Sequence, residues 1–475
     1  MQRKFVLNLA LLLLLNFLIK PFWIFGIDRT VQNLLPSEDY GTYFALFNFS
    51  LLFNILLDVG ITSFNNKNIA QNTSELTKYF SGIVMFKFLL AVLYFAVTFA
   101  VGIVIGYDEM RFKMLLFLSV NQFLISFIQY LRSNIAGLQM FALDSFFSVL
   151  DKTLMILFCA ILIWGNWFSA DFTIMHFVYG QTLAYLVAAL LIFIVVFVKA
   201  SSFSLKVDKS FLIKIIKQTL PFALLVLTMT FYYRVDAVML DYLLEDGEYQ
   251  SAVYAQAYRL MDATNQIGVL FAGLLLPMFS FMIKRKQKVN NLVKLSFTLI
   301  FIPSIILAII CYSSSQEIIT LLYNQTNESI EVLPILMFCF VAIASTYIFG
   351  TLLTANNNLK ALNTLSIIGL IINVGLNLVL IPSYKAYGSA VASLVTQVII
   401  IVVQIILVKR YFKFSFNFKY LATLLLIISI LFFININFQL NLIYKFILIG
   451  SVGIVLSFIF KIVNVKDVKK LLQSR

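Results

Sequence analysis

The sequence predicts an all-α integral membrane protein with about fourteen transmembrane helices. Only 12% of its 475 residues are charged and 61% are hydrophobic, whereas a soluble protein carries roughly 25% charged residues. The apolar residues form long runs, each close to the roughly 20 residues that a helix needs to cross the hydrocarbon core. Short connections join the runs, so no polar stretch is long enough to build a soluble domain.

The predicted helices follow one another closely along the chain. The first twenty residues, "MQRKFVLNLALLLLLNFLIK", resemble a signal peptide, but no small-residue cleavage site follows them. We therefore interpret them as an uncleaved membrane helix. The predicted spans are 5–27, 41–62, 79–103, 114–131, 145–165, 173–198, 218–243, 251–281, 292–313, 331–354, 363–381, 388–408, 420–437 and 442–462.

The loop charges predict that both termini lie in the cytoplasm. When the spans alternate from a cytoplasmic N-terminus, most Lys and Arg residues fall on the cytoplasmic side, as in "KRKQK" at 284–288. The external loops hold more acid, as in "LLEDGEY", and few bases: Arg29, Arg111, Lys113, Lys385 and Lys445. This asymmetry explains the net charge of +14 better than nucleic-acid binding does.

A weak internal repeat predicts two lobes. "LLPSEDYGTYFALFNFSLL" begins at Leu34 and "LLEDGEYQSAVYAQAYRLM" begins at Leu243, each with a leucine pair, an acidic turn and tyrosines that lead into a helix. Six helices fill the distance between the copies, and an even number preserves orientation, so the halves would be parallel repeats. We expect an N-lobe at 1–200, a C-lobe at 201–410, and two added helices with a cytoplasmic tail at 411–475.

Charged residues inside the spans are candidates for function. A charge at the centre of a membrane helix costs about 2.5–3.5 kcal/mol on insertion scales, so these residues should face a bundle interior or a watery cavity. Arg234 and Asp236 are two residues apart and cannot pair along one helix, whereas Arg259 and Asp262, three apart, can. The residues concerned are Lys20, Asp58, Lys87, Asp151, Lys152, Arg234, Asp236, Arg259 and Asp262.

The positions of some of these residues favour either a functional or a structural role. Lys20 precedes Pro21, which can open a kink at a cavity, and we expect both Lys20 and Arg234 to be functional. Lys87 is intermediate. Structural ion pairs are favoured for the residues closer to the inner interface, which are Asp58, Asp151 and Lys152.

Cysteine and histidine usage predicts no metal or disulfide site, and no cofactor is expected. Cys159, Cys311 and Cys339 lie singly in apolar runs without a C-x-x-C pair, and His176 has no partner at metal-ligand spacing.

Three stretches resemble Wzx-type polysaccharide flippases of the multidrug/oligosaccharidyl-lipid/polysaccharide exporter superfamily. "LLPSEDYGTYFALFNFSLLFNILLDVGI" is similar to the first external loop and second helix of that family. "RVDAVMLDYLLEDGEYQSAVYAQAYRL" resembles its seventh and eighth helices, and "NNNLKALNTLSIIGLIINVGLNLVLIPSYKAYGSAVASLVTQVI" its eleventh and twelfth. The resemblance covers nearly the whole chain; Ala252 stands where the family often has glycine.

The resemblance implies a MATE-like fold, with two six-helix lobes around a cavity that opens alternately to either side. It implies a protein of the bacterial cytoplasmic membrane that moves an undecaprenyl-diphosphate-linked oligosaccharide outward for O-antigen, capsule or exopolysaccharide assembly. Membrane lipids, a polysaccharide polymerase and glycosyltransferases are the implied partners. The residues that would supply counter-charge to the diphosphate are Lys20, Lys87, Arg234 and Arg259. The acids that would bind a coupling H⁺ or Na⁺, or pair with these bases, are Asp58, Asp236 and Asp262.

Other functions stay open at this point. A lipid II flippase of the same superfamily fits the number of spans, whereas a multidrug antiporter typically has twelve. A membrane-embedded polymerase or ligase is less favoured, because the longest external loops are short and lack arginine and histidine. No filter-like sequence suggests a channel.

Overall fold

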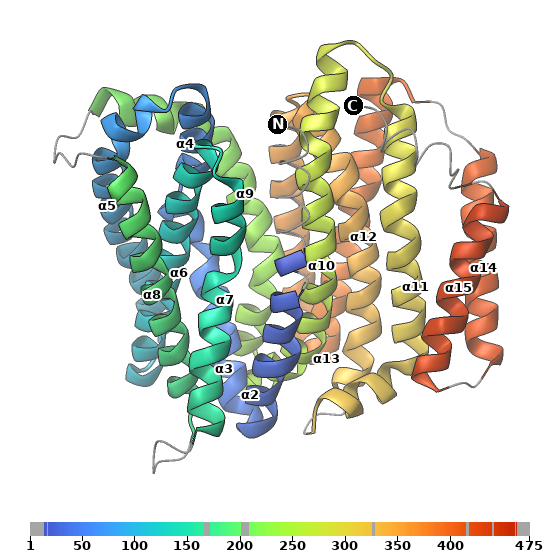
Figure 1. The fold of residues 1–475 in the computed structure, drawn as a ribbon. Coiled ribbons are helices and arrows are strands. Elements are labelled where there is room, and N and C mark those ends of the chain that lie inside the picture. Colours follow the sequence, from blue (N-terminus) through green and yellow to red (C-terminus); the bar gives the residue numbers. More distant parts are fainter. Residues whose placement is uncertain are drawn as a thin grey trace. The chain divides into compact units, whose positions relative to one another are not determined.

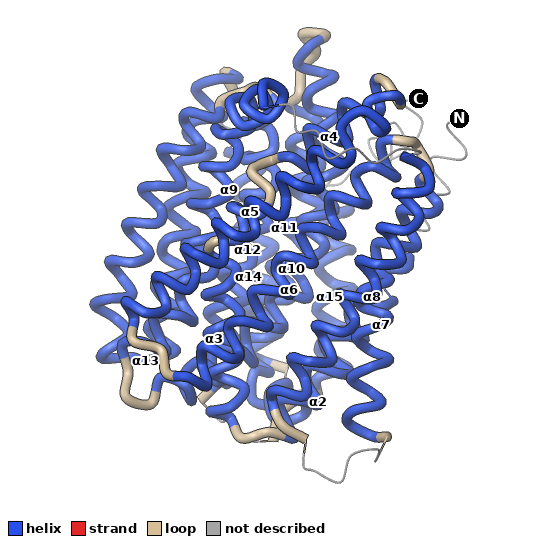
Figure 2. The backbone as a smooth tube through the Cα atoms, turned by 90° about the vertical axis from the view of Figure 1, so that its left-hand side faces the viewer, coloured by secondary structure: helices blue, strands red, loops and turns tan. Residues whose placement is uncertain are grey.

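The computed structural model describes residues 14–16, 18–165, 172–200, 209–324, 328–414, 418–438, 441–460 and 462. Within these ranges every regular element is helical and no strand occurs (Figure 2). The chain divides into two compact units, Met1–Ala252 and Val253–Arg475.

In its described residues, the first unit contains a π-helix, a 3₁₀ helix and eight α-helices that lie wholly within it. Figure 1 shows their arrangement. Helix α6 is its centre, because α3, α4, α7 and α8 all pack against it. The elements are η1 (Trp23–Asp28), α2 (Arg29–Leu34), α3 (Ser37–Leu52), η2 (Asn54–Leu57), α4 (Ile61–Gln71), α5 (Ser74–Ile105), α6 (Glu109–Gly137), α7 (Phe141–Trp164), α8 (Ile174–Ala200) and α9 (Lys209–Leu243).

The second unit begins inside α10 and is built around α12. This helix is among the most buried of the chain, because α11 and α13 pack along it. The elements are α10 (Gly247–Lys284), α11 (Asn290–Leu322), α12 (Ser329–Ala355), α13 (Leu359–Phe412), α14 (Phe418–Asn437) and α15 (Leu442–Ile459).

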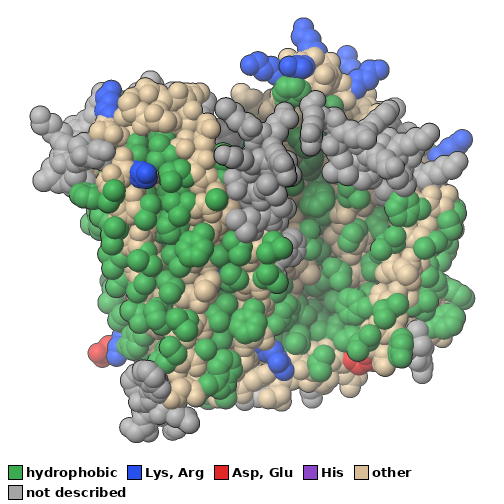
Figure 3. Space-filling view, in the orientation of Figure 1, with side chains coloured by type: hydrophobic (Ala, Val, Ile, Leu, Met, Phe, Trp, Pro, Cys, Tyr) green, Lys and Arg blue, Asp and Glu red, His purple; other side chains and the backbone are tan. Residues whose placement is uncertain are grey.

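Eleven of the described helices are long and apolar enough to cross a membrane, which makes this a multi-pass membrane protein. One of them, α13, contains two predicted spans, joined where Lys385 adopts non-helical φ and ψ angles of 51° and −133°. Leu, Ile, Val and Phe side chains cover the flanks of the units, and basic side chains gather at one end (Figure 3). The predicted all-α membrane class is confirmed; the first predicted span begins outside the described residues.

Polar contacts attach α14 and α15 to the second unit at a kink in α11. The backbone of α11 is non-helical at Ser314. The ammonium of Lys445 on α15 donates to the hydroxyl oxygens of Ser314, at 3.2 Å, and Ser313, at 3.4 Å. Asn435 on α14 accepts from Ser313 and donates to the Ile309 carbonyl. Lys445, expected among the external charges, is therefore buried against a helix kink.

Candidate functional site

The second predicted span, 41–62, is not one continuous helix. Helix α3 ends at Leu52, a 3₁₀ turn follows, and α4 starts only at Ile61. Between them Val59 and Gly60 have φ angles of +46° and +81°, in the left-handed region. This region is strained for a β-branched residue and breaks the ladder of backbone hydrogen bonds. The interruption leaves backbone carbonyls inside the bundle that need new donors.

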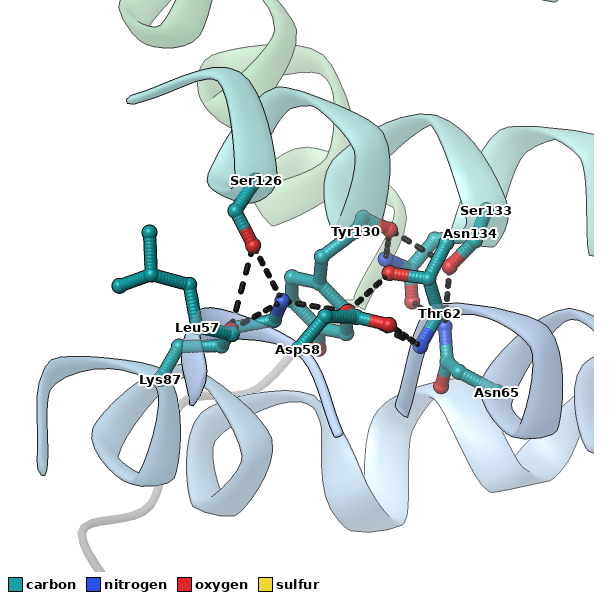
Figure 4. A network of polar contacts seen from close by, with 9 residues as sticks. All are labelled: Leu57, Asp58, Thr62, Asn65, Lys87, Ser126, Tyr130, Ser133 and Asn134. Atoms are coloured by element: carbon teal, nitrogen blue, oxygen red, sulfur yellow. Dashed lines mark hydrogen bonds and ion pairs between the residues drawn. The ribbon is translucent and has the colours of Figure 1, made fainter. Parts of the chain in front are cut away.

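Lys87 of α5 supplies one of these donors (Figure 4). Its ammonium lies 2.9 Å from the Leu57 carbonyl oxygen, 2.6 Å from Asp58 Oδ1 and 2.9 Å from Ser126 Oγ. An ammonium has three N–H groups, and all three are taken up by protein acceptors. The Lys87 side chain is 1% exposed, so in this structure its charge is used to hold the interrupted helix together.

Asp58 links the break to the start of α4. Its carboxylate accepts from the Thr62 hydroxyl at 2.5 Å and from the Thr62 backbone N–H at 3.3 Å, so it acts as a helix cap as well as the partner of Lys87. Farther along α4, Asn65 donates to Ser133 and Asn134 of α6 (Figure 4). Asp58, for which a structural ion pair is predicted, is thus paired with Lys87 in the structure.

A second group of charges lies between the N-terminal helical residues and α7. Lys152 donates to the Tyr185 hydroxyl at 2.9 Å and lies over the rings of Trp23 and Tyr185, at 5.5 and 5.1 Å from their centroids. The Asp151 carboxylate is 3.8 Å from the Lys152 ammonium. Lys20 is half-buried in the same region and interacts electrostatically with both. Lys20, which we expect to be functional, therefore lies beside Asp151 and Lys152, for which structural ion pairs are predicted.

Arg234 and Asp236 have different surroundings on α9. Arg234 is half-buried, and its Nη1 lies 3.5 Å from Asn48 Oδ1 on α3. Asp236 is 1% exposed, so it does not share the partly open environment of Arg234. Arg259 and Asp262 lie in the second unit, on α10, and are both half-buried.

Asp28 is a buried acid that the sequence pattern did not single out. It ends the π-helix η1, is 1% exposed, and accepts from the Tyr40 hydroxyl at 3.0 Å and from Gln32 Nε2 at 3.0 Å. π-helical turns often occur at functional sites. In the sequence Asp28 stands beside Arg29 just after the first apolar run, where it is indistinguishable from a loop charge.

Three further residues, Arg111, Asp241 and Glu248, form what we call the outer ion cluster. The guanidinium of Arg111 contacts both oxygens of Asp241, at 2.6 and 3.1 Å, and Glu248 Oε1 at 2.8 Å. Arg111 is in the first turn of α6 and Asp241 in the last turn of α9, so each charge opposes the dipole of its own helix. Their positions are therefore explained by the contact between helices.

Asp39, in the first turn of α3, is affected electrostatically by Glu248 of this cluster. Burial, followed by the charges of Glu248 and Glu38, raises the pKa of Asp39 above its ordinary value. The ionised carboxylate is thus less favourable in the folded protein than in the unfolded chain. We expect Asp39→Asn to raise the melting temperature at neutral pH. The gain should be absent below the ordinary pKa and should grow as pH rises to the folded-state pKa.

Thermal unfolding in detergent between pH 4 and pH 8 measures this effect. Glu109→Gln, at the exposed first turn of α6, is the matched control and should show no such gain. A lower melting temperature for Asp39→Asn at neutral pH would contradict the prediction.

Within the described ranges, no three His, Cys, Asp or Glu side chains are grouped closely enough to hold a metal ion.

The sequence model of one protein family, described as polysaccharide biosynthesis protein, matches residues 8–283, which is more than half of the chain. The chain belongs to the polysaccharide biosynthesis protein family. The match includes the interrupted helix, the outer ion cluster and Lys20. No curated protein matches the sequence significantly.

Solved structures confirm the MATE-like fold. An outward-facing multidrug resistance MATE transporter of the MOP superfamily is 17% identical, with a TM-score of 0.61, over 86% of this chain and 95% of the other. The lipid II flippase MurJ in an inward closed conformation is 13% identical, with a TM-score of 0.61, over 92% and 99%. A MOP transporter from Pyrococcus furiosus is 17% identical, with a TM-score of 0.55, over 86% and 94%.

Family and fold together confirm the predicted membership in this exporter superfamily. At these identities the solved structures establish the arrangement of helices and leave the substrate open. The roles of the intramembrane charges, and the lobe boundaries at 200 and 410, stay predictions.

Proposed function

We propose that the protein is a flippase that moves undecaprenyl-diphosphate-linked oligosaccharides from the inner to the outer leaflet of the bacterial cytoplasmic membrane. The observation that carries this proposal is the family match to polysaccharide biosynthesis proteins on a MATE-like transporter fold. Both termini would be cytoplasmic, as the loop charges predict. The product would serve a polymerase that assembles O-antigen, capsule or exopolysaccharide.

The chemistry of this substrate calls for cations inside the membrane. A diphosphate crossing a region of low dielectric constant needs counter-charge, and arginine can contact phosphate oxygens with two parallel hydrogen bonds. Lys20, Arg234 and Arg259 are half-buried, so part of each side chain stays accessible to a ligand. Lys87 could contact a phosphate only after its bond to Asp58 opened, because its three N–H groups are already used.

The acids would take a different part in the cycle. We propose that Asp236 and Asp262 bind a coupling H⁺ or Na⁺, or pair with the bases between transport steps. For Asp58 the ion-pair role is favoured by its contact with Lys87.

Two alternatives within the superfamily are kept. MurJ is a lipid II flippase with the same fold, and MATE proteins are multidrug transporters. A membrane-embedded polymerase or ligase is disfavoured by the transporter fold. A deletion strain separates these functions. Our proposal predicts viable cells that lose a surface glycan and accumulate oligosaccharide-diphosphate lipid on the inner leaflet, detected by mass spectrometry. Loss of viability with accumulated lipid II would replace the proposal with the lipid II function.

Arg234→Ala tests the residue that we expect to contact the diphosphate. A hydrogen bond to a charged group contributes about 1.5–3 kcal/mol, so flipping should fall by about ten- to a hundredfold. Arg234→Lys keeps the charge without the planar donor pair and should retain an intermediate rate. Complementation of the deletion strain, normalised to the amount of folded protein, measures the effect.

Arg410→Ala, at an exposed site near the end of α13, is the matched control and should leave flipping unchanged. Full flipping by Arg234→Ala would remove this residue from the proposed site.

A further inference from the structure

Helix α10 is shared by the two units. The boundary falls between Ala252 and Val253, inside a helix that runs without interruption from Gly247 to Lys284. Helix α9 and the first turn of α10 are thus grouped with the helices that precede them in the chain.

Contacts at three levels hold α9 to the first unit. The outer ion cluster holds Asp241 at one end of the helix. Near the middle, the ring of Phe231 lies edge-on to Phe53, with 5.9 Å between centroids. At the other end, a Cβ on Gly60 would lie 2.7 Å from Thr219 Cβ, so the Thr219 side chain of α9 packs directly against the backbone of the interrupted helix.

The first turn of α10 is held to the same unit. A Cβ on Gly41 would lie 1.7 Å from the Glu248 carbonyl oxygen, which means that the backbones of α3 and α10 are in direct contact. The Ser251 hydroxyl donates to the Ala237 carbonyl of α9 at 3.2 Å.

From Val253 onward, hydrogen bonds join α10 to residues of the second unit. The Ser329 hydroxyl lies 3.1 Å from the Val253 carbonyl oxygen and 2.7 Å from Gln256 Oε1, and the Tyr323 hydroxyl lies 3.4 Å from the Gln256 carbonyl oxygen. Two successive turns of one helix are therefore bound to different units. Because the Val253 and Gln256 carbonyls each have a hydroxyl partner, their intrahelical bonds can lengthen at reduced cost, as they do in helix bends.

We propose that α9 and the first turn of α10 move with the first unit during transport, and that α10 bends between Val253 and Leu260, where the intrahelical bonds of the Val253 and Gln256 carbonyls lie. The proposal rests on the proposed flippase function, which requires two arrangements of the units. Arg111 is then a positioning residue, since it fixes the segment that precedes the bend. Functionally, α9 belongs with the helices before it and is separate from the rest of the C-lobe predicted at 201–410.

Distances between spin labels test the proposal in proteoliposomes, with and without undecaprenyl diphosphate. The native cysteines are buried, so labels can be attached to cysteines introduced at exposed positions. One pair, Met110→Cys with Glu245→Cys, joins α6 to the α9–α10 connection within the first unit. A second pair, Glu245→Cys with Gln316→Cys, spans the bend.

We expect the lipid to shift the distance across the bend and to leave the distance within the first unit unchanged. An equal shift in both pairs would overturn the bend while leaving the flippase function intact. A shift in the Met110–Glu245 pair alone would also overturn the bend, because α9 would then move with the second unit. No shift in either pair would overturn both proposals, because the lipid would then cause no rearrangement.

A variant of Arg111 separates a positioning role from a merely stabilising one. In Arg111→Gln the distance distribution of the Met110–Glu245 pair should broaden at temperatures well below unfolding, and Arg111→Lys should restore part of its sharpness. An unchanged distribution in Arg111→Gln, with only a lower melting temperature, would show that Arg111 does not position α9.

Discussion

Replacing Lys87 with methionine is expected to lower the free energy of unfolding by about 3 kcal/mol. Removing one partner of a buried ion pair leaves the other charge uncompensated, at a cost of about 3–5 kcal/mol. The lower end of this range applies because the Asp58 side chain is 22% exposed, so its charge is partly solvated. The Leu57 carbonyl would also lose one of its two donors, leaving Ser126. Thermal unfolding and the yield of folded protein in detergent measure the loss.

Two companion variants make this result specific. Asp58→Asn combined with Lys87→Met removes both charges and should recover most of the stability. Lys78→Met, an exposed lysine on the same helix α5, should have little effect. If Lys87→Met were as stable as the unmodified protein, the ion pair would not hold the interrupted helix.

Gly41→Ala is expected to be the most damaging single-methyl addition in the first unit. Its Cβ would lie 1.7 Å from the Glu248 carbonyl oxygen and 3.1 Å from the Ala252 nitrogen, both backbone atoms that cannot rotate away. Helices α3 and α10 must then separate. Inserting atoms into a closely packed contact costs about 1–3 kcal/mol, and we expect the upper end here.

The chain offers a matched control on α10 itself. Around Gly273 a Cβ would meet nothing within 4 Å, and alanine is favoured over glycine in a helix by about 1 kcal/mol. Gly273→Ala should therefore preserve or raise the melting temperature, whereas Gly41→Ala lowers it. Equal melting temperatures for the two variants would contradict the close contact at Gly41.

Most helices could be predicted because the number of residues in each apolar run can be counted in the sequence. The span predicted at 173–198 corresponds to α8, Ile174–Ala200. The span predicted at 442–462 corresponds to α15, Leu442–Ile459. The break near Val59 could not be predicted, because "FNILLDVGI" is as apolar as a continuous helix and hydropathy does not depend on backbone angles. Its cause lies in contacts with residues far along the chain.

The candidate site was predictable as a set of charges but not as a set of contacts. The cost of burying charge identified Lys20, Lys87 and Arg234 for attention. The contacts of each charged side chain depend on residues that are distant in the chain. A single sequence does not show which distant residues lie close together in the fold. Arg111 and Asp241, 130 residues apart, were missed for the same reason.

The interrupted helix has a consequence for how the chain enters the membrane during synthesis. The Leu57 carbonyl receives its hydrogen bonds from Lys87 and Ser126, which are made 30 and 69 residues later. Until those residues emerge from the ribosome, the break has polar backbone groups with no protein partner and cannot be left in contact with lipid. We therefore expect the segments α3 to α6 to enter the bilayer as one assembled group.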